Sequence, residues 1–242
     1  MGWLRSTRKC AVSKHPCSIR KLNIISEPSD LELSEAQIET FAGWRRPNER
    51  FNSSPEGQNA EYSETQLMIA SNAIDLVQDI TTDCSVVASL CAGTARAFKG
   101  HGKVDFFFLD DKITLLTALL KLFTSIIYPH DKEKHCPQVS RNGKYIFRLH
   151  FNGCFRKVIV DDRLPASNSS RSLHVVDRNN PNLLWPALIE KAYLKVRGGY
   201  DFPGSNSGTD LWVLTGWIPE QTFLQRYTPF FSKKLGNANL GG

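Results

Sequence analysis

The sequence predicts an α+β fold, and three local signals support that prediction. Thr82 and Asp83 offer side-chain oxygens that cap helix N-termini, so a helix is expected to begin at Cys84. Asn152-Gly153 separates two β-rich runs, which is a strong hairpin signal because both central turn residues must take positive φ. The third signal is an amphipathic helix further along the chain. Helices and an antiparallel hairpin together define the class.

Two earlier segments also carry helix signals. In residues 34–44 and in residues 63–77, a serine is followed three residues later by a glutamine, which is the spacing of a capping box. Apolar residues in the second segment recur at helical intervals. We therefore expect helices in both segments, and we expect the helix that begins at Cys84 to run toward Phe98.

Residues 113–128 are almost entirely apolar, but Lys121 interrupts them. The stretch is shorter than the roughly 18 to 20 residues that a helix needs to cross a bilayer. We therefore interpret it as a buried helix or an anomaly of the sequence, and not as a membrane span.

The amphipathic helix that provides the third signal is expected over residues 183–197. Apolar side chains recur there on a single helical stripe: Leu184, Leu188, Ala192 and Val196. Pro186 is tolerated in the first turn, and Gly198 is a suitable C-terminal stop. A Gly/Ser/Asn loop over residues 204–208 follows.

Composition is ordinary for a globular chain and excludes wholesale disorder, with 41% apolar and 22% charged residues. The net charge of +6 gathers at the start of the chain, so residues 1–62 are read as a basic, largely irregular leader. A solvated leader is favoured over a nucleic-acid-binding arm. No apolar signal-peptide core is present, so the six cysteines are expected to be reduced thiols. No metal site is expected, because His135-Cys136 lacks a second ligand pair.

Gln78 and Cys84 form the most informative chemical pattern. A cysteine in the first turn of a helix has its thiolate stabilised by unpaired backbone N–H groups and by the helix dipole. The Cys84 N–H and the Gln78 side-chain amide would supply two donors to an oxyanion during acyl transfer. On residue types alone, a small buried cysteine is the commoner explanation.

The sequence also resembles a known family. The segment around the cysteine reads QDITTDCSVVASL, and it is followed by NGCFRKVIVDDRLP and LLWPALIEKAYLKVRGGYDFPGSNSGTDLWVLTGWIPE. These motifs resemble the calpain family of papain-like cysteine endopeptidases. Ser85, together with GYDFPGSNS, is similar to the PalB-type branch, whose fungal members act in ambient-pH signalling.

The resemblance implies a papain-like cleft enzyme and assigns roles to particular residues. Cys84 would be the nucleophile on a helical first lobe, and Gln78 would bind the oxyanion. The substrate side of the cleft would be a loop that contains Gly204, Ser205, Asn206 and Gly208. Trp185 and Glu190 match a helix that buttresses this lobe, where we expect a packing residue and a surface residue.

The chain also departs from the family pattern. The resemblance places a catalytic domain at residues 63–227, interrupted by an atypical insert at 104–121 and followed by an atypical tail at 228–242. Papain-type enzymes carry a histidine and an asparagine on the order of 130 to 150 residues after the cysteine. No histidine here lies that far downstream, since the last one is His174. We therefore expect a truncated second, β-rich lobe and an inactive chain as given.

The sequence thus predicts an intracellular calpain-like cysteine endopeptidase fragment, with a non-catalytic calpain-lobe interaction protein as the alternative. The resemblance implies a protein substrate, which in fungi is a pH-response transcription factor. It also implies a cytoplasmic location with contacts to endosomal sorting complexes. A nucleic-acid partner is not expected, because only the basic leader would support one. No cofactor is expected; calcium regulates part of the family, but no acidic loop here has EF-hand spacing.

Overall fold

The computed structural model describes residues 30–47, 67–69, 74–98, 123, 125–133 and 136–220. Within these ranges the helices are α1 (Glu35–Ile38), α4 (Cys84–Phe98), α6 (Trp185–Arg197) and α7 (Ser207–Thr215). The strands are β1 (Phe41–Arg45), β2 (Leu76–Val77), β3 (Ile127–Tyr128), β4 (His130–Asp131), β5 (Cys136–Pro137), β6 (Lys144–Phe151), β7 (Cys154–Asp161), β8 (Leu164–Ser167) and β9 (Val176–Asp177). The predicted α+β class is confirmed.

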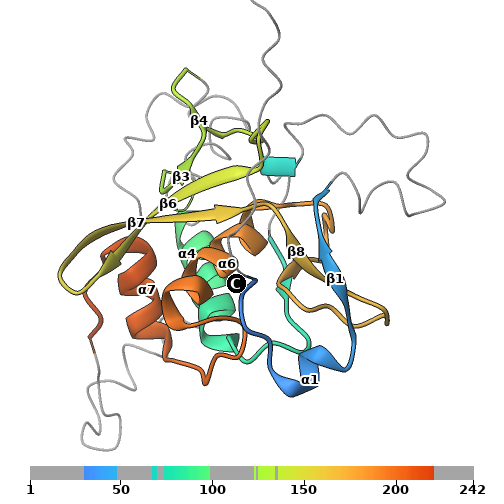
Figure 1. Cartoon of the computed structure of the whole chain (residues 1–242). Coiled ribbons are helices and arrows are strands. Elements are labelled where there is room, and N and C mark those ends of the chain that lie inside the picture. Colours follow the sequence, from blue (N-terminus) through green and yellow to red (C-terminus); the bar gives the residue numbers. More distant parts are fainter. Residues whose placement is uncertain are drawn as a thin grey trace, which may run out of the picture.

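The strands pair into small antiparallel sheets. One sheet has the order β3-β6-β7, and the other pairs are β1 with β8, β2 with β9, and β4 with β5. In Figure 1 the β3-β6-β7 sheet crosses above α4, α6 and α7, while β1 and β8 lie on the right. Helix α4 contacts both α6 and α7, and these two helices also contact β6. The core therefore lies between the sheet and the three helices.

Strands β6 and β7 form the predicted hairpin. Asn152 (φ 50°) and Gly153 (φ 77°) occupy its turn, and both take the positive φ that the turn requires. Alternate side chains along β6 are buried: Tyr145, Phe147 and Leu149. This period of two is expected for a strand that packs one face on helices.

Helix α6 is more deeply buried than its sequence predicts. All ten residues from Trp185 to Leu194 are buried, including Glu190 and Lys191, so the helix has no solvated face over that length. The predicted apolar stripe is buried up to Ala192, but Val196 is exposed. As expected, the helix tolerates Pro186 in its first turn and ends at Gly198, which adopts a φ of 114°.

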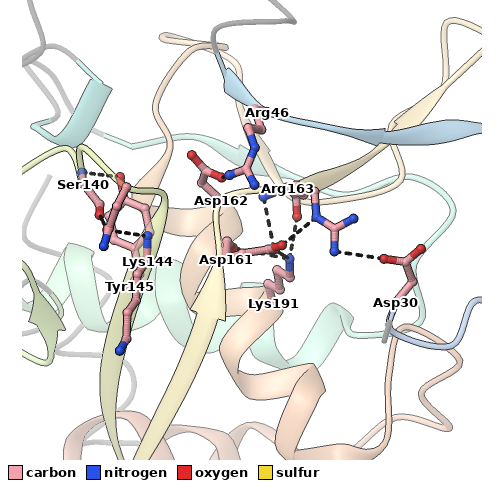
Figure 2. Close-up of polar contacts among 10 residues, drawn as sticks. Asp30, Arg46, Ser140, Lys144, Tyr145, Asp161, Asp162, Arg163 and Lys191 are labelled. Carbon is pink, nitrogen blue, oxygen red and sulfur yellow. Dashed lines mark hydrogen bonds and ion pairs between the residues drawn. The ribbon is translucent and has the colours of Figure 1, made fainter. Parts of the chain in front are cut away.

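A buried ion pair joins α6 to the end of β7 (Figure 2). The Lys191 ammonium contacts the Asp161 carboxylate, and the two side chains are only 1% and 0% exposed. Lys191 Nζ also donates to the Arg163 carbonyl at 2.6 Å. Arg163 Nε donates to Asp161 Oδ2 at 2.6 Å, and its guanidinium reaches Asp30 at 3.1 Å. Arg46 pairs with the adjacent Asp162. The network thus ties α6 to the turn between β7 and β8 and to the chain before α1.

The helix predicted over residues 34–44 is wrong in its second half. The capping box of Ser34 and Gln37 is present, but it starts only the four-residue helix α1. The chain then becomes strand β1, which pairs with β8. Pairing with a strand distant in sequence has overridden a local helix signal, which single-sequence reasoning cannot detect.

Two further predicted helices need correction. The helix predicted over residues 63–77 is wrong at its end, because Leu76–Val77 is strand β2, held by β9. The buried helix predicted over residues 113–128 is also wrong at its end, because Ile127–Tyr128 is strand β3. The insert at 104–121, most of the leader and the tail lie outside the described residues. Among the helices that are described, none has the length and apolarity to span a membrane.

We expect Lys191→Met to lower the free energy of unfolding by about 1.5 to 3 kcal/mol, because the buried Asp161 carboxylate loses its ammonium partner and retains the Arg163 guanidinium. Urea unfolding monitored by circular dichroism measures the change. Lys157→Met, at an exposed position of β7, is the control and should stay within about 0.5 kcal/mol of the parent. If the two substitutions changed the free energy of unfolding equally, the buried ion pair would not be a major source of stability.

Candidate active site

Cys84 is the first residue of α4, as the sequence predicts, and its side chain is exposed. The first hydrogen bonds of the helix run from the N–H groups of Val86 and Val87 to the Asp83 carbonyl, at 2.8 and 3.2 Å. The N–H groups of Cys84 and Ser85 therefore belong to the unpaired donors of a helix start. These donors and the helix dipole stabilise negative charge on the Cys84 sulfur or on an oxygen bound beside it.

The predicted side-chain caps of this helix are not formed. Thr82 Oγ1 donates its hydrogen bond to the Phe202 carbonyl, on the segment that precedes α7. The Asp83 side chain is fully buried, and neither of its oxygens accepts a hydrogen bond from the first turn of α4. Both side chains interact with residues that are distant in the sequence, so neither caps the helix as the local sequence suggests.

Gln78 directly follows β2 and lies on the connection that leads from β2 to Cys84. Its side-chain amide donates to the Thr81 carbonyl, three residues before Cys84. The amide nitrogen carries a second hydrogen, which is chemically suited to an oxyanion. The Ile80 N–H donates to the Ser172 carbonyl at 3.3 Å, so the connection between β2 and α4 is fixed to the loop before β9. Gln78 and Cys84 thus belong to one short connection between β2 and α4.

The segment after α6 lies along the start of α4. Ser205 Oγ is 3.0 Å from Ser85 Oγ, and Ser89 Oγ donates to the Ser207 carbonyl at 3.2 Å. Gly204 has a φ of 95°, and a Cβ there would lie 3.7 Å from the Thr82 carbonyl oxygen. The structure therefore places Gly204 and Ser205 next to the residues that flank Cys84.

Asn206 and Gly208 have structural roles instead of lying in an open loop. Asn206 is the N-cap of α7, and its side chain accepts the Thr209 N–H at 3.0 Å. Gly208 lies inside α7, where a Cβ would come within 3.0 Å of Pro219. The loop predicted over residues 204–208 therefore ends at Asn206, because α7 starts at Ser207.

Asp210 is a site residue that the sequence reasoning missed. Its side chain is fully buried, and one oxygen accepts hydrogen bonds from both Ser205 and Tyr193. Burial and the Asp210 carboxylate raise the pKa of Tyr193 to about 12, so the phenol stays a donor. The chain Ser85–Ser205–Asp210–Tyr193 thus links α4, α7 and α6. An acidic residue directly before the apolar run Leu211–Leu214 was the available signal.

Glu190 is a residue that the sequence reasoning placed wrongly. It was expected at the surface, but its side chain is 0% exposed, whereas Trp185 is a packing residue as expected. Both Glu190 oxygens accept the Val175 N–H at 3.0 Å. Its carboxyl faces that of Asp83, and burial is the main cause that raises the pKa of both groups. Sequence alone does not distinguish a buried acid from a solvated one on a charged helix.

The histidines of the described ranges each have contacts with other parts of the fold. His174 is buried, with Nδ1 3.2 Å from the Pro165 carbonyl oxygen. The His150 ring packs edge-on against Trp212 and Phe155, with centroid distances of 4.2 and 5.1 Å. His130 belongs to β4, which pairs with β5. Within the part of the chain that the structure describes, no group of three His, Cys, Asp or Glu side chains is arranged to hold a metal ion.

Comparisons with known proteins relate the chain to cysteine proteases. Residues 101–238 match the sequence profile of the calpain family of cysteine proteases. The chain is 54% identical over 201 residues to the calpain-like protease palB of Emericella nidulans, and 54% identical over 200 residues to palB/cpr-8 of Neurospora crassa. It is 40% identical over 203 residues to calpain-7 of Homo sapiens.

The three alignments cover 83%, 83% and 84% of this chain but only 21%, 19% and 21% of the relatives. The chain therefore spans about a fifth of the length of the curated relatives it matches. The family profile begins after Cys84. An aligned span of 201 residues in a chain of 242 must nevertheless include Gln78 and Cys84, wherever the span begins.

We expect iodoacetamide to alkylate Cys84 faster than Cys154 at neutral pH. Both side chains are exposed, but Cys84 starts a helix, whereas Cys154 starts a strand just after the hairpin turn. Peptide mass spectrometry of partly labelled protein gives the two rates. The difference should disappear in urea, and equal rates in the folded protein would contradict the proposed helix-start effect.

We expect Asp210→Asn to lower the free energy of unfolding by about 1 to 3 kcal/mol, because two buried hydrogen bonds lose their charged acceptor. Amide exchange at Ser205 should also become faster, since the segment loses one of its ties to α7. Asp201→Asn, at an exposed position of the same segment, should change stability by less than about 0.5 kcal/mol. If both variants behave like the parent, the Asp210 network contributes little.

Proposed function

This chain belongs to the calpain family of cysteine proteases, and on that premise we propose that it is the cysteine-bearing part of an endopeptidase that uses Cys84 as its nucleophile. One observation carries the proposal: Cys84 is exposed at the first residue of a long, well-packed helix whose initial N–H groups are unpaired. Gln78, on the same connection, is the proposed second donor to the oxyanion.

The proposed reaction is acyl transfer in two steps. The Cys84 sulfur bonds to the peptide carbonyl carbon, and the carbonyl oxygen becomes an oxyanion held by the Cys84 N–H and the Gln78 amide. The C–N bond then breaks, and an imidazolium donates the proton that the leaving amine needs. Water attacks the resulting thioester, releases the carboxylic acid and restores the thiol. The segment at Gly204 and Ser205 is proposed to line the path of the extended substrate.

The proposal assigns the imidazole to a histidine outside the described ranges. His130 lies in the β4–β5 pair, the His150 ring packs against Trp212 of α7, and His174 lies at the Pro165 carbonyl. The chain spans only about a fifth of the length of its relatives. We therefore propose that a histidine and an asparagine of a second, β-rich lobe complete the site, as the family resemblance implies.

The proposed substrates are proteins that undergo limited cleavage. The chain is similar to fungal palB proteases. As the family resemblance implies, we propose that it acts in an intracellular pH-response pathway, with a transcription factor as substrate and contacts to endosomal sorting complexes. The rival function is a non-catalytic calpain lobe that holds a partner, and the activity experiment below separates the two.

We expect the 242-residue chain to show no measurable peptidase activity, with or without calcium, because neither the base nor the acid for the two steps is assigned to it. A version extended with the second lobe's His and Asn should cleave a fluorogenic peptide. Cys84→Ser in that version should abolish cleavage, and Cys154→Ser should leave it unchanged.

Two results would contradict this proposal. Cys84-dependent cleavage by the unextended chain would give one of its own histidines the role of base. An extended protein that folds, positions its His and Asn, and still cleaves nothing would favour the interaction protein.

A further inference from the structure

Two carboxyl groups meet in the core directly beside the candidate nucleophile. Asp83 precedes Cys84, Glu190 lies on α6, and both side chains are 0% exposed. Their carboxyls are within hydrogen-bonding reach of each other. Glu190 is anchored on its other side by the Val175 N–H, which both of its oxygens accept.

This contact requires a hydrogen between the two groups. An ionised carboxylate can only accept hydrogen bonds, so two ionised carboxyls cannot bond to each other. The Thr81 side chain and the Asp83 backbone also interact with the Asp83 carboxyl, but they supply no hydrogen between the two acids. Two negative charges this close in a buried site cannot both persist, so one carboxyl retains its proton. Desolvation by burial is the largest cause that raises the pKa of each group, and the mutual charge adds to it for Glu190.

The described groups around the pair do not favour double ionisation. From α7, the Asp210 charge raises the pKa of Asp83 further. Tyr200 is fully buried, and its pKa is raised well above the ordinary value by burial and then by both carboxyls. Lys191, the next residue on α6, is paired with Asp161, and the His174 ring is at the Pro165 carbonyl. The two carboxyls therefore titrate as one unit.

The orientation of Asp83 has a direct consequence for the start of α4. An aspartate at a helix N-cap ordinarily turns its carboxylate to the N–H of the second or third helical residue. These residues are Ser85 and Val86, and Asp83 bonds to neither with its side chain. The first-turn donors beside Cys84 are thereby left without a carboxylate in front of them.

We propose that Asp83 and Glu190 share one proton in the folded protein, and that Glu190 is thereby a positioning residue for Cys84. Glu190 holds the Asp83 side chain inside the core and keeps its charge away from the N–H groups that stabilise the thiolate and the oxyanion. The inference rests on the proposed role of Cys84 as nucleophile.

The test is the iodoacetamide alkylation rate of Cys84 in the full 242-residue chain between pH 5 and 10, with exposed Cys154 as the internal reference. Glu190→Ala removes the partner of Asp83, so the carboxylate should ionise, turn to the first-turn N–H groups and slow Cys84 alkylation at pH 7 by about tenfold. Its pH profile should move to higher pH. Leu188→Ala, at another fully buried position of α6, controls for general loosening of the helix.

Two further variants make the test specific. Glu190→Gln can donate an amide hydrogen to Asp83 and accept the Val175 N–H, so it should keep the alkylation rate within about threefold of the parent. Adding Asp83→Asn to Glu190→Ala removes the charge that would face the helix start, and it should restore most of the lost rate. Such rescue is not expected if Glu190 acts only through packing.

The pH dependence of stability provides a second readout. A carboxyl whose pKa is raised by folding contributes stability that is fully present below its unfolded pKa, near the ordinary value of 4.5 for Glu190, and is lost as pH rises through the folded value. The melting temperature of the parent should therefore fall more between pH 5 and 9 than that of Glu190→Gln, whose side chain carries no such proton.

The outcomes separate this inference from the proposed function. If Cys84 is alkylated no faster than Cys154 in the parent chain, the nucleophile assignment fails. If Cys84 is fast but Glu190→Ala and Leu188→Ala change its pH profile alike, or Asp83→Asn brings no rescue, the proton-sharing role of Glu190 is wrong. A parent and a Glu190→Gln variant with the same melting temperature against pH would also overturn it.

Discussion

Two adjacent charged side chains of α6, Glu190 and Lys191, are buried in the core, and the arrangement around them follows from the need to give each a partner. A buried charge without a partner is far more costly than a solvated one. Lys191 meets Asp161 at the end of β7. Glu190 accepts the Val175 N–H and, by our inference, shares a proton with Asp83 at the start of α4. Helix α6 is therefore tied to the strand end shown in Figure 2 and also contacts the cysteine helix α4.

This constraint explains why the candidate site forms where it does. The start of α4 is set by the Asp83 carbonyl, which accepts the first helical hydrogen bonds, while the Asp83 side chain points to α6. The segment before α7 is fixed to the same place by Ser205, which contacts Ser85 and donates to Asp210. The exposed Cys84 thus begins a helix whose first residues are held by contacts with neighbouring elements. Such support is what a preorganised nucleophile requires.

Much of the fold could be predicted from the sequence where local signals dominate. The helix that starts at Cys84, the hairpin turn at Asn152-Gly153 and the glycine stop of α6 follow from capping, turn and stop residues. Predictions failed where a distant strand decides the structure: β1 is held by β8, and β2 is held by β9. The helix signals of those segments are real locally, but a single sequence does not show the pairing partner.

The site was predicted in part for the same reason. Gln78 and Cys84 could be proposed as site residues because they lie close together in the sequence. Asp210 and the burial of Glu190 could not, because their partners Ser205, Tyr193 and Asp83 come from other elements. Buried acids on helices resemble solvated ones until the packing is known.

The central claim is that the start of the cysteine helix and α6 form one structural unit. Native-state hydrogen exchange under increasing denaturant tests it most directly, through the amides of Val86 and Val87 on α4 and of Leu188 on α6. The account predicts that these amides open with the same free energy and the same denaturant dependence. Exchange of Val86 and Val87 through a local opening that is independent of denaturant, while Leu188 stays protected, would contradict it.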